Sequence, residues 1–597
     1  MLLAQEQEPR GPVMIALSAR QQRNKSLTSL LVLLAVAAAI VPVTSGCRGS
    51  GTPVVTIDSG AIGGAYVNGL VRYLGIPYAA PPVGNLRWKP PQPVKHWNGV
   101  KACVKVGPEC PQVKLIPTKN APPQSEDCLY LNVWTPAKAA SRRLPVMFWI
   151  HGGAYQLGAG GLPLYDGEKL ASRGVVVVTI NYRLGPFGFL AHPLLTKESP
   201  NHSSGNYGVL DQIAALKWVK RNATAFGGDP SRVTIFGESA GAMSVFNQLV
   251  SPLSAGLFQQ AISESSLFLD RGLLMHDTRP LAEAEGIGEQ YAADIGCASS
   301  PDVLAAMRGR STSALLGIPQ DKSEDLTSSG ALLTNPGLFV KDPRFVPVVD
   351  GWVLPQDPGT MVGNGDQHAV PLLLGSNSEE GNLFTASTTL KLDKMSVAEY
   401  QAKLRQYFGA YTDQVLAMFP VTKQSDIKKE LSRIFTVFDF TSAARIAARS
   451  QAGKGQKVFL YQFDKTPPLE LMSILGPCHG SELPFVFGTI VKGSLPDGVK
   501  RSWSSLVLEG TLRDLRSLFI DKYYQDDLRL SDEMIGYWTR FAKTGDPNTK
   551  GVFAWPDYQA ATDRNIELQV PFTVKAGLEN NACNLADSFY AQFYPGL

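Results

Sequence analysis

The segment 233–250 constrains the fold of this chain more than any other part of the sequence. It reads as a short β-branched and aromatic strand, then the turn Gly237-Glu238-Ser239-Ala240-Gly241, then an apolar helix. This is the G-x-S-x-G pattern of a sharp strand-to-helix turn, in which the serine takes a strained conformation. Side chains at Gly237 or Gly241 would collide with neighbouring backbone. The turn would place the Ser239 hydroxyl at a helix N-terminus, where free amides favour a nearby oxyanion.

A G-x-S-x-G motif also occurs in ordinary glycine-rich turns, so the motif alone does not establish a nucleophilic serine. A serine that takes part in acyl transfer needs a general base, an acid that orients the base, and hydrogen-bond donors for the oxyanion. Each of these roles has a candidate elsewhere in the chain.

The candidate oxyanion donors lie in the loop His151-Gly-Gly-Ala154, directly after an uninterrupted apolar strand. The loop matches the HGGG type, which supplies backbone N–H groups. Gly152 and Gly153 would let a substrate oxygen approach the main chain, and the amide of Ala240 would add a further donor. The alternative is a common Gly-Gly turn, but the position after a buried strand and before the serine turn favours an oxyanion loop.

The candidate base is His479, in the tight loop Gly476-Pro-Cys-His-Gly480. The chain has only seven histidines, and five of the other six have polar or loop-like surroundings without a second feature. The sixth, His151, belongs to the oxyanion loop and is expected to be structural. His479 would also complete the order serine, acid, histidine along the chain.

The orienting acid must lie between Ser239 and His479, at the end of a buried strand. The apolar run 371–374 is such a strand, and Glu379 and Glu380 follow it closely. Adjacent carboxylates on a loop are usually solvated, and only one of this pair can point inward. A carboxylate here would hold the imidazole in the correct tautomer and stabilise the imidazolium. The residues themselves leave the choice between the two glutamates open.

The wider pattern predicts an α/β fold. Strands alternate with helices, which indicates βαβ units and a mostly parallel central sheet flanked by helices. With 597 residues and 44% hydrophobic content, the chain can bury a large core. We expect one catalytic domain over residues 55–597, a flexible lead-in at 48–54, and helical insertions at 280–345 and 392–455.

Composition and motifs exclude several classes of function. The net charge is only +4 and no basic stripe is visible, so nucleic acid is not an expected partner. The sequence has no H-E-x-x-H motif and no cluster of histidine and aspartate with ligand spacing. We therefore expect neither a metal nor another cofactor.

The first 47 residues indicate export. Arg20, Arg23 and Lys25 lie shortly before the apolar stretch 27–43, and small residues then lead to Cys47. The stretch is short and no basic stop-transfer cluster follows it, which favours a cleavable signal over a spanning helix. Cleavage alone would leave a secreted or periplasmic protein. Lipidation of Cys47 would instead anchor the protein to a membrane, and the sequence leaves both outcomes open.

The seven cysteines are consistent with an oxidising compartment. Cys110 and Cys128 are close enough in sequence to close a short loop, and such a disulfide would contribute roughly 3 kcal/mol by loop entropy. Spacing alone does not determine how the cysteines pair.

Taken together, these motifs resemble the type-B carboxylesterases, the family of the cholinesterases and related lipases. The resemblance runs from about residue 55 to the C-terminus, and its motifs occur in the order of the family. It rests on residues 73–79, 125–132, 151–154, 181–183, 205–212, 226–242, 380–381, 479, 482–488, 538, 541 and 545–548.

The resemblance implies an α/β-hydrolase fold and a serine esterase that acts on small-molecule esters through an acyl-enzyme, without a cofactor. It implies Ser239 as nucleophile and His479 as base, with Glu380 as the orienting acid. The further residues that it implies are the oxyanion donors Gly152, Gly153 and Ala240 and the disulfide Cys110–Cys128.

Two alternatives stay open beside a short-chain esterase. A lipase for long acyl chains would differ only in the shape of its substrate gorge. A non-catalytic adhesion domain on the same fold would lack the nucleophile or the base, and this chain has both. The chain also departs from the family at Ser265-Ser266, where many members have Ser-Gly.

Overall fold

The computed structural model describes residues 51–113, 122–137, 142–269, 273–274, 277–317, 333–336, 341–386, 392–467, 475–490, 511–594 and 596. The predicted export segment 1–47, including Cys47, lies outside these residues. The first strand, β1, begins at Val54, the last residue of the predicted lead-in.

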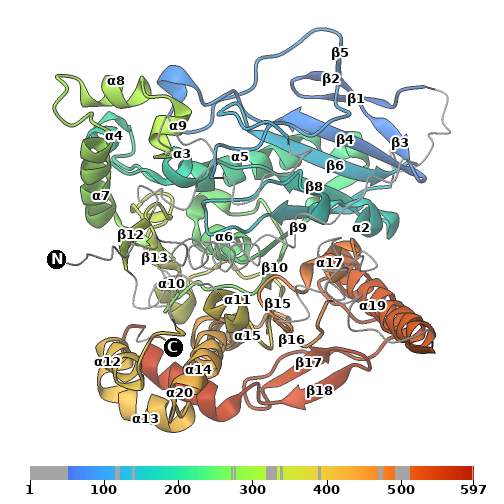
Figure 1. Ribbon diagram of the computed structural model, residues 1–597. Coiled ribbons are helices and arrows are strands. Elements are labelled where there is room, and N and C mark those ends of the chain that lie inside the picture. Colours follow the sequence, from blue (N-terminus) through green and yellow to red (C-terminus); the bar gives the residue numbers. More distant parts are fainter. Residues whose placement is uncertain are drawn as a thin grey trace, which may run out of the picture.

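Within the described residues, a mixed sheet of eleven strands forms the centre of the structure (Figure 1). Its seven central strands, in the order β17-β16-β15-β10-β9-β7-β8, are all parallel, and the strands added at both edges are antiparallel. In chain order the strands are β3 (Ala65–Val67), β4 (Leu70–Pro77), β6 (Tyr130–Pro136), β7 (Leu144–Ile150), β8 (Val176–Ile180), β9 (Gly228–Glu238), β10 (Gln260–Glu264), β15 (Leu372–Asn377), β16 (Val458–Phe463), β17 (Arg564–Leu568) and β18 (Thr573–Ala576).

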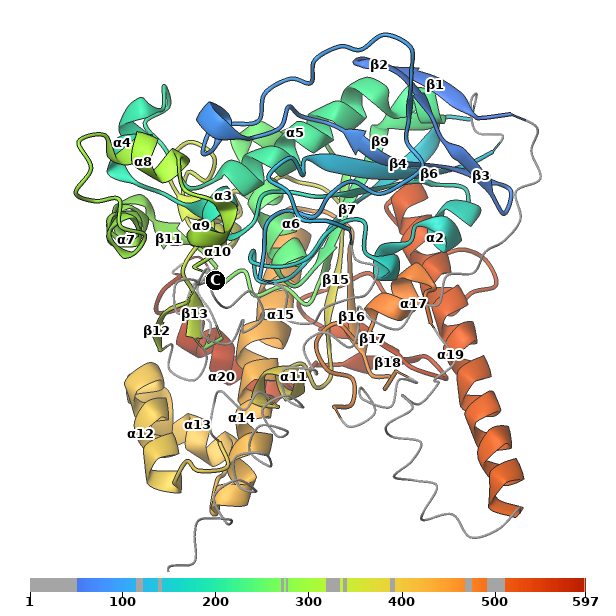
Figure 2. The ribbon, with the colours of Figure 1, turned by 45° about the horizontal axis from the view of Figure 1, so that its top comes forward.

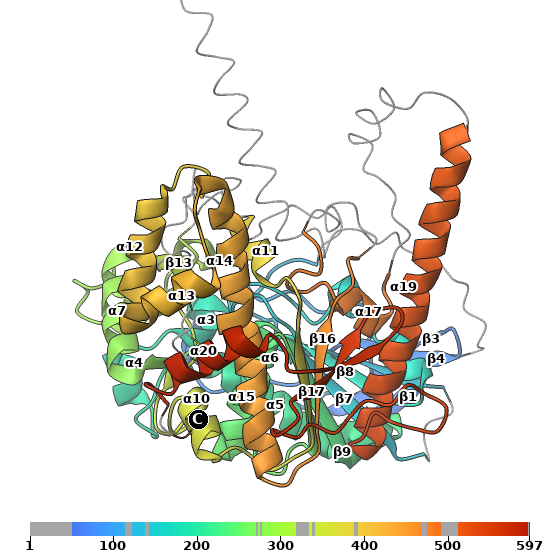
Figure 3. The same cartoon turned by 90° about the horizontal axis from the view of Figure 1, so that it is seen from below.

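The sheet is covered by helices on both faces, which explains why its central strands are almost continuously apolar. Successive residues of β7 point into two separate cores: Phe148 into one and Trp149 into the other. The first core contains α5 (Tyr207–Asn222), α6 (Ala240–Val250) and α15 (Ser442–Gly453), and the second contains α2 (Glu168–Ser172), α17 (Leu483–Phe487) and α19 (Thr511–Thr544). Figure 3 shows the sheet between α6 and α15 on one side and α19 on the other. The predicted α/β fold with a mostly parallel sheet is confirmed.

Both predicted insertions contain helices, and the second forms the group α12 to α14 at one end of the molecule (Figure 2). The first insertion also contains two short strands that the sequence reading missed. The helices are α7 (Leu281–Asp294), α8 (Val303–Arg308), α9 (Thr312–Leu315), α12 (Val397–Phe408), α13 (Thr412–Met418) and α14 (Ile427–Phe435), and the strands are β12 (Leu333–Pro336) and β13 (Lys341–Pro343).

Smaller elements complete the fold. They are the strands β1 (Val54–Ile57), β2 (Gly60–Gly63), β5 (Val100–Ala102), β11 (Arg279–Pro280) and β14 (Val348–Val349), and the helices α3 (Gly185–Phe189), α4 (Pro193–Glu198), α10 (Pro358–Asn364), α11 (Gly381–Thr385) and α20 (Asn580–Tyr590). Among the helices of the described residues, none combines the length and apolar character needed to cross a membrane.

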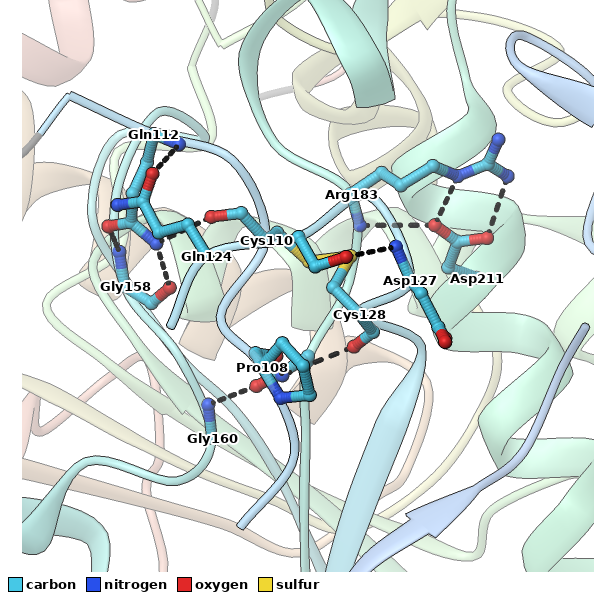
Figure 4. The surroundings of a disulfide bond; sticks show 12 residues. Pro108, Cys110, Gln112, Gln124, Asp127, Cys128, Gly158, Gly160, Arg183 and Asp211 are labelled. Carbon is cyan, nitrogen blue, oxygen red and sulfur yellow. Dashed lines mark hydrogen bonds and ion pairs between the residues drawn. A yellow bond between two sulfur atoms is a disulfide. The ribbon is translucent and has the colours of Figure 1, made fainter. Parts of the chain in front are cut away.

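The structure contains the Cys110–Cys128 disulfide (Figure 4). Gln112, two residues beyond Cys110, exchanges two hydrogen bonds of 2.9 Å with the backbone of Gly158. The loop closed by the disulfide therefore supports the segment that follows the His151 loop. The other cysteines in the described residues are buried and free: Cys103, Cys297, Cys478 and Cys583.

Candidate active site

Ser239 lies at the turn between β9 and α6, as the sequence predicts. Its φ of 57° and ψ of −126° are rare for a residue with a side chain. Its N–H donates to the carbonyl of Glu264 at 3.0 Å, and its carbonyl accepts from the N–H of Met243 at 2.9 Å. A Cβ at Gly241 would overlap the carbonyl oxygen of Ile150 at the end of β7. Contacts with two neighbouring strands thus hold the strained turn in place.

The His151 loop packs directly against this turn. A Cβ at Gly152 would lie 2.7 Å from the carbonyl oxygen of Glu238 and 3.0 Å from the Cβ of Ser239, so only glycine fits. Gly153 has a φ of 112°, and a side chain there would overlap the backbone of Leu157. The two glycines therefore bring their backbone close to the serine.

Ala240 follows Ser239 directly and is the first residue of α6. The first N–H groups of an α-helix have no partner within the helix, so they are free to bind an anion. This geometry suits the oxyanion role predicted for Gly152, Gly153 and Ala240.

His151 itself is a structural residue of the loop. Its ring is fully buried, stacks on Tyr182 with ring centroids 4.5 Å apart, and places Nδ1 2.8 Å from the carbonyl oxygen of Gly152. Burial lowers the pKa of His151 to about 4, so the ring is neutral at ordinary pH.

His479 and Glu380 meet although they are 99 residues apart, with His479 Nδ1 2.6 Å from Glu380 Oε2. Glu380 is fully buried, and its Oε1 accepts from the Ser265 hydroxyl at 2.5 Å and from the Asn377 N–H at 2.7 Å. Glu379 is exposed and accepts from the side chain of Asn382. Of the two predicted glutamates, the structure therefore brings Glu380 against the histidine.

The imidazole of His479 is enclosed by two aromatic rings. The centroids of Phe384 and Phe440 lie 5.2 Å and 4.9 Å from that of His479. Phe384 belongs to α11, directly after Glu380, and Phe440 belongs to the π-helix η9 (Thr436–Thr441). Thr436 of η9 also accepts the N–H of Gly381 at 3.0 Å. The π-helix thus supports both the histidine and the turn that carries the acid, a position in which π-helical segments are common.

Sequence reasoning missed a group of buried carboxyl groups around the histidine. Glu238 Oε1 lies 3.3 Å from His479 Nε2, and Glu264 and Glu482 are fully buried nearby. The signal was present: Glu264 ends an otherwise uncharged buried strand, and Glu482 follows His479 by three positions. An ionisable residue such as Glu264 at the end of a buried strand indicates a carboxyl group that is enclosed by the fold.

Burial dominates the ionisation of these groups. It raises the pKa of Glu238 to about 7 and that of Glu264 to about 8, and it raises the pKa of Glu482 well above its usual range. Burial alone would lower the pKa of His479, but the carboxylates of Glu238 and Glu380 outweigh this effect and raise it.

The arrangement suits acyl transfer. It offers a hydroxyl on a strained turn, backbone N–H groups of the neighbouring glycine loop and of the first residue of α6, and an imidazole held between a buried acid and the same turn. Among the described residues, no three histidine, cysteine, aspartate or glutamate side chains are grouped so that they could hold a metal ion.

Comparison with known proteins places the chain in a family. The model of the carboxylesterase family matches residues 51–586. The fumonisin B1 esterase of Sphingopyxis macrogoltabida is 37% identical over 507 residues, which cover 84% of each chain. The para-nitrobenzyl esterase of Bacillus subtilis (strain 168) is 36% identical over 532 residues, covering 87% of this chain and 96% of that protein. A solved structure of PNB esterase aligns with a TM-score of 0.70 at 34% identity, covering 90% of this chain and 100% of the other.

Proposed function

The chain belongs to the carboxylesterase family of serine esterases, and we propose that it is an exported enzyme that hydrolyses small-molecule carboxylic esters with Ser239, His479 and Glu380. The fold is then an α/β-hydrolase fold, and the seven parallel strands carry the three residues at or after their C-terminal ends.

In the proposed reaction, Ser239 Oγ attacks the ester carbonyl carbon while His479 Nε2 takes the hydroxyl proton. The N–H groups of Gly152, Gly153 and Ala240 bind the oxyanion. The C–O bond to the alcohol then breaks, and His479 returns the proton to the leaving oxygen. Water, deprotonated by His479, then attacks the acyl carbon; the bond to Ser239 Oγ breaks, His479 returns the proton to Oγ, and the acid is released. Glu380 orients the ring and stabilises its charged form throughout.

The observation that carries this proposal is the hydrogen bond of 2.6 Å between His479 Nδ1 and the buried Glu380. Two further donors, Ser265 and the Asn377 N–H, hold the other carboxylate oxygen. A carboxylate with three donors keeps a fixed direction, so it fixes the tautomer of the ring and leaves Nε2 free to act as a base.

Relatives named for fumonisin B1 and for para-nitrobenzyl esters support small-molecule esters as the substrate class. A lipase for long acyl chains is the second candidate, because the same chemistry serves both and only the substrate gorge differs.

Export is proposed from the basic and apolar segment before residue 47, and the Cys110–Cys128 disulfide is consistent with an oxidising compartment. A secreted or periplasmic protein and a protein anchored through a lipid on Cys47 are the two outcomes. Fractionation of cells that express the full chain or Cys47→Ser separates them. If only the variant loses membrane association, the lipid anchor is supported. If neither protein associates with the membrane, simple cleavage is supported.

The decisive experiment is hydrolysis of p-nitrophenyl esters of increasing acyl length by the full chain, with Ser239→Ala beside it. We expect Ser239→Ala to lose about six orders of magnitude in kcat. Ser172→Ala, which changes an exposed serine of α2, should keep the wild-type rate. Turnover of Ser239→Ala at the wild-type rate would contradict the mechanism. The fastest acyl length separates esterase from lipase, and inactivity at every length would favour a narrow substrate gate or a binding role.

A further inference from the structure

Glu264, the last residue of β10, is a fully buried carboxyl group without a charged partner. Its Oε1 accepts a hydrogen bond of 2.7 Å from the indole N–H of Trp538 in α19. Among the described residues, Oε2 has no hydrogen-bond partner and no lysine, arginine or histidine forms an ion pair with Glu264. A buried carboxylate in such a setting would cost several kcal/mol, so the group keeps its proton instead.

The groups that face Glu264 from neighbouring elements reinforce the neutral form. Each is either acidic or an uncharged phenol, so ionisation of Glu264 would add a negative charge beside others. These groups are Glu238 from β9, Tyr461 from β16, Tyr165 from the 3-10 helix η2 (Pro163–Tyr165), and Glu482 directly before α17.

The main chain at Glu264 connects the nucleophile to the orienting acid. The carbonyl of Glu264 accepts the N–H of Ser239 at 3.0 Å, which helps to hold the strained backbone of the serine. The next residue, Ser265, donates its hydroxyl to Glu380 and its N–H to the carbonyl of Gly375 at 2.9 Å. A shift of this strand end would therefore disturb Ser239 and Glu380 together.

We propose that Glu264 is a positioning residue that acts as a neutral carboxylic acid. By anchoring the end of β10 to Trp538, it keeps the Ser239 backbone and the Ser265–Glu380 hydrogen bond in place, and its ionisation lowers esterase activity at alkaline pH. The inference rests on the triad proposed above. It assigns Glu264 no contact with substrate and no proton transfer during turnover.

The direction of titration agrees with this role. Burial raises the pKa of Glu264 to about 8, the Trp538 hydrogen bond lowers it, and the charge of Glu238 raises it. When the carboxyl group ionises, repulsion from the charge of Glu238 and the cost of keeping a carboxylate away from water favour movement of the strand end out of its present position.

The test is the pH dependence of kcat for a p-nitrophenyl ester from pH 6 to pH 10, corrected for spontaneous hydrolysis. Wild-type kcat should fall with a midpoint near pH 8. Glu264→Gln has the same shape and cannot ionise, so it should keep kcat at pH 7 within about threefold and lose this alkaline decline. Glu379→Gln, which changes an exposed carboxylate, should keep the wild-type midpoint.

Trp538→Phe gives a second and independent measurement. Removing the indole donor takes away the anchor of the strand end, so kcat at pH 7 should fall, and it also takes away the hydrogen bond that lowers the pKa of Glu264, so the alkaline midpoint should rise. A merely structural loss would make the protein more sensitive to alkali and move the midpoint down. Titration of Glu264 and a merely structural loss therefore predict shifts of the alkaline midpoint in opposite directions in Trp538→Phe.

An alkaline midpoint that is unchanged in Glu264→Gln, or that falls in Trp538→Phe, overturns the inference. The full removal of the decline in Glu264→Gln and the upward shift in Trp538→Phe support it. Ser239→Ala is measured in parallel: its inactivity keeps the proposed triad, whereas its activity refutes the triad independently of how Glu264 behaves.

Discussion

His479 Nε2 lies 3.3 Å from Glu238 Oε1, so the imidazole contacts a second carboxyl group on the side opposite Glu380. Glu238 directly precedes Ser239, and the same contact therefore joins the histidine to the serine turn. The two carboxylates stabilise the charged ring, which cannot act as a base until it loses its proton.

This contact predicts how kcat/KM depends on pH in the acidic range. The pKa of His479 is raised above 6.5, so kcat/KM should reach its full value only above that pH. Glu238→Gln removes a carboxylate that raises the pKa of His479, so it lowers that pKa and moves the acidic limb of kcat/KM to lower pH. An acidic limb that stays in place or moves up in this variant would show that Glu238 does not influence the base.

The choice between the adjacent glutamates can be tested directly. Glu380→Gln keeps the shape of the side chain but removes the charge that fixes and stabilises the ring, so kcat should fall by about four orders of magnitude. Glu379→Gln changes the exposed neighbour and should stay within about twofold of wild type. Steady-state kinetics and circular dichroism of both variants make the comparison, and equal losses in the two would refute the assignment of Glu380.

The buried ion pair of Arg183 and Asp211 predicts a stability effect remote from the chemistry (Figure 4). Arg183 Nε lies 2.7 Å from Asp211 Oδ2, and both side chains are almost fully buried. Arg183→Met would leave the carboxyl group of Asp211 buried without its partner, at a cost of about 3–5 kcal/mol.

The matched control for that pair is the double variant Arg183→Met/Asp211→Asn, in which neither side chain is charged. We expect Arg183→Met to have the lowest thermal midpoint of the three proteins and the double variant to recover part of the loss. If the double variant melts below the single one, the unpaired carboxyl group is not the cause of the destabilisation.

Asp439 of η9 predicts a change of stability with pH. It is buried, accepts the N–H of Leu273 at 2.6 Å, and has a pKa raised by burial to about 8. Because this is above the ordinary value of 3.8, the stability that the neutral group contributes is complete in acid and is lost as pH rises towards 8.

Asp439→Asn keeps the acceptor for Leu273 and removes the titration. The thermal midpoint of the variant minus that of wild type should therefore be larger at pH 9 than at pH 5. Other titrating groups cancel in this difference, so an equal difference at both pH values would mean that Asp439 does not titrate in this range.

Much of the fold and part of the site could be predicted because they depend on local rules. The glycines around Ser239 and in the His151 loop are required by the backbone at those positions, and they can be recognised in any chain. Apolar runs alternating with helical periods predicted the parallel sheet, since strands covered on both faces must be apolar throughout. The short pair β12 and β13 was missed because strands of three or four residues carry too little pattern.

The ionisation of the site could not be predicted in this way. Whether Glu238, Glu264 or Glu379 is charged depends on the groups that surround it, and those come from strands far apart in the chain. Burial raises the pKa of Glu264, and its neighbours Glu238 of β9, Tyr461 of β16 and Trp538 of α19 supply no cation within the described residues.

The sequence by itself therefore determined the fold class, the strained turn at Ser239 and the glycine loop after His151, because each follows from backbone geometry or from periodicity within a short segment. The residues alone left Glu379 and Glu380 open and the family resemblance favoured Glu380; the tertiary structure brings Glu380 against His479, and only the tertiary structure decided that Glu238 contacts the other ring nitrogen. The physical reason is that burial and charge are properties of neighbours in space, and assembly of the sheet is what makes Ser265, Asn377 and His479 neighbours of Glu380.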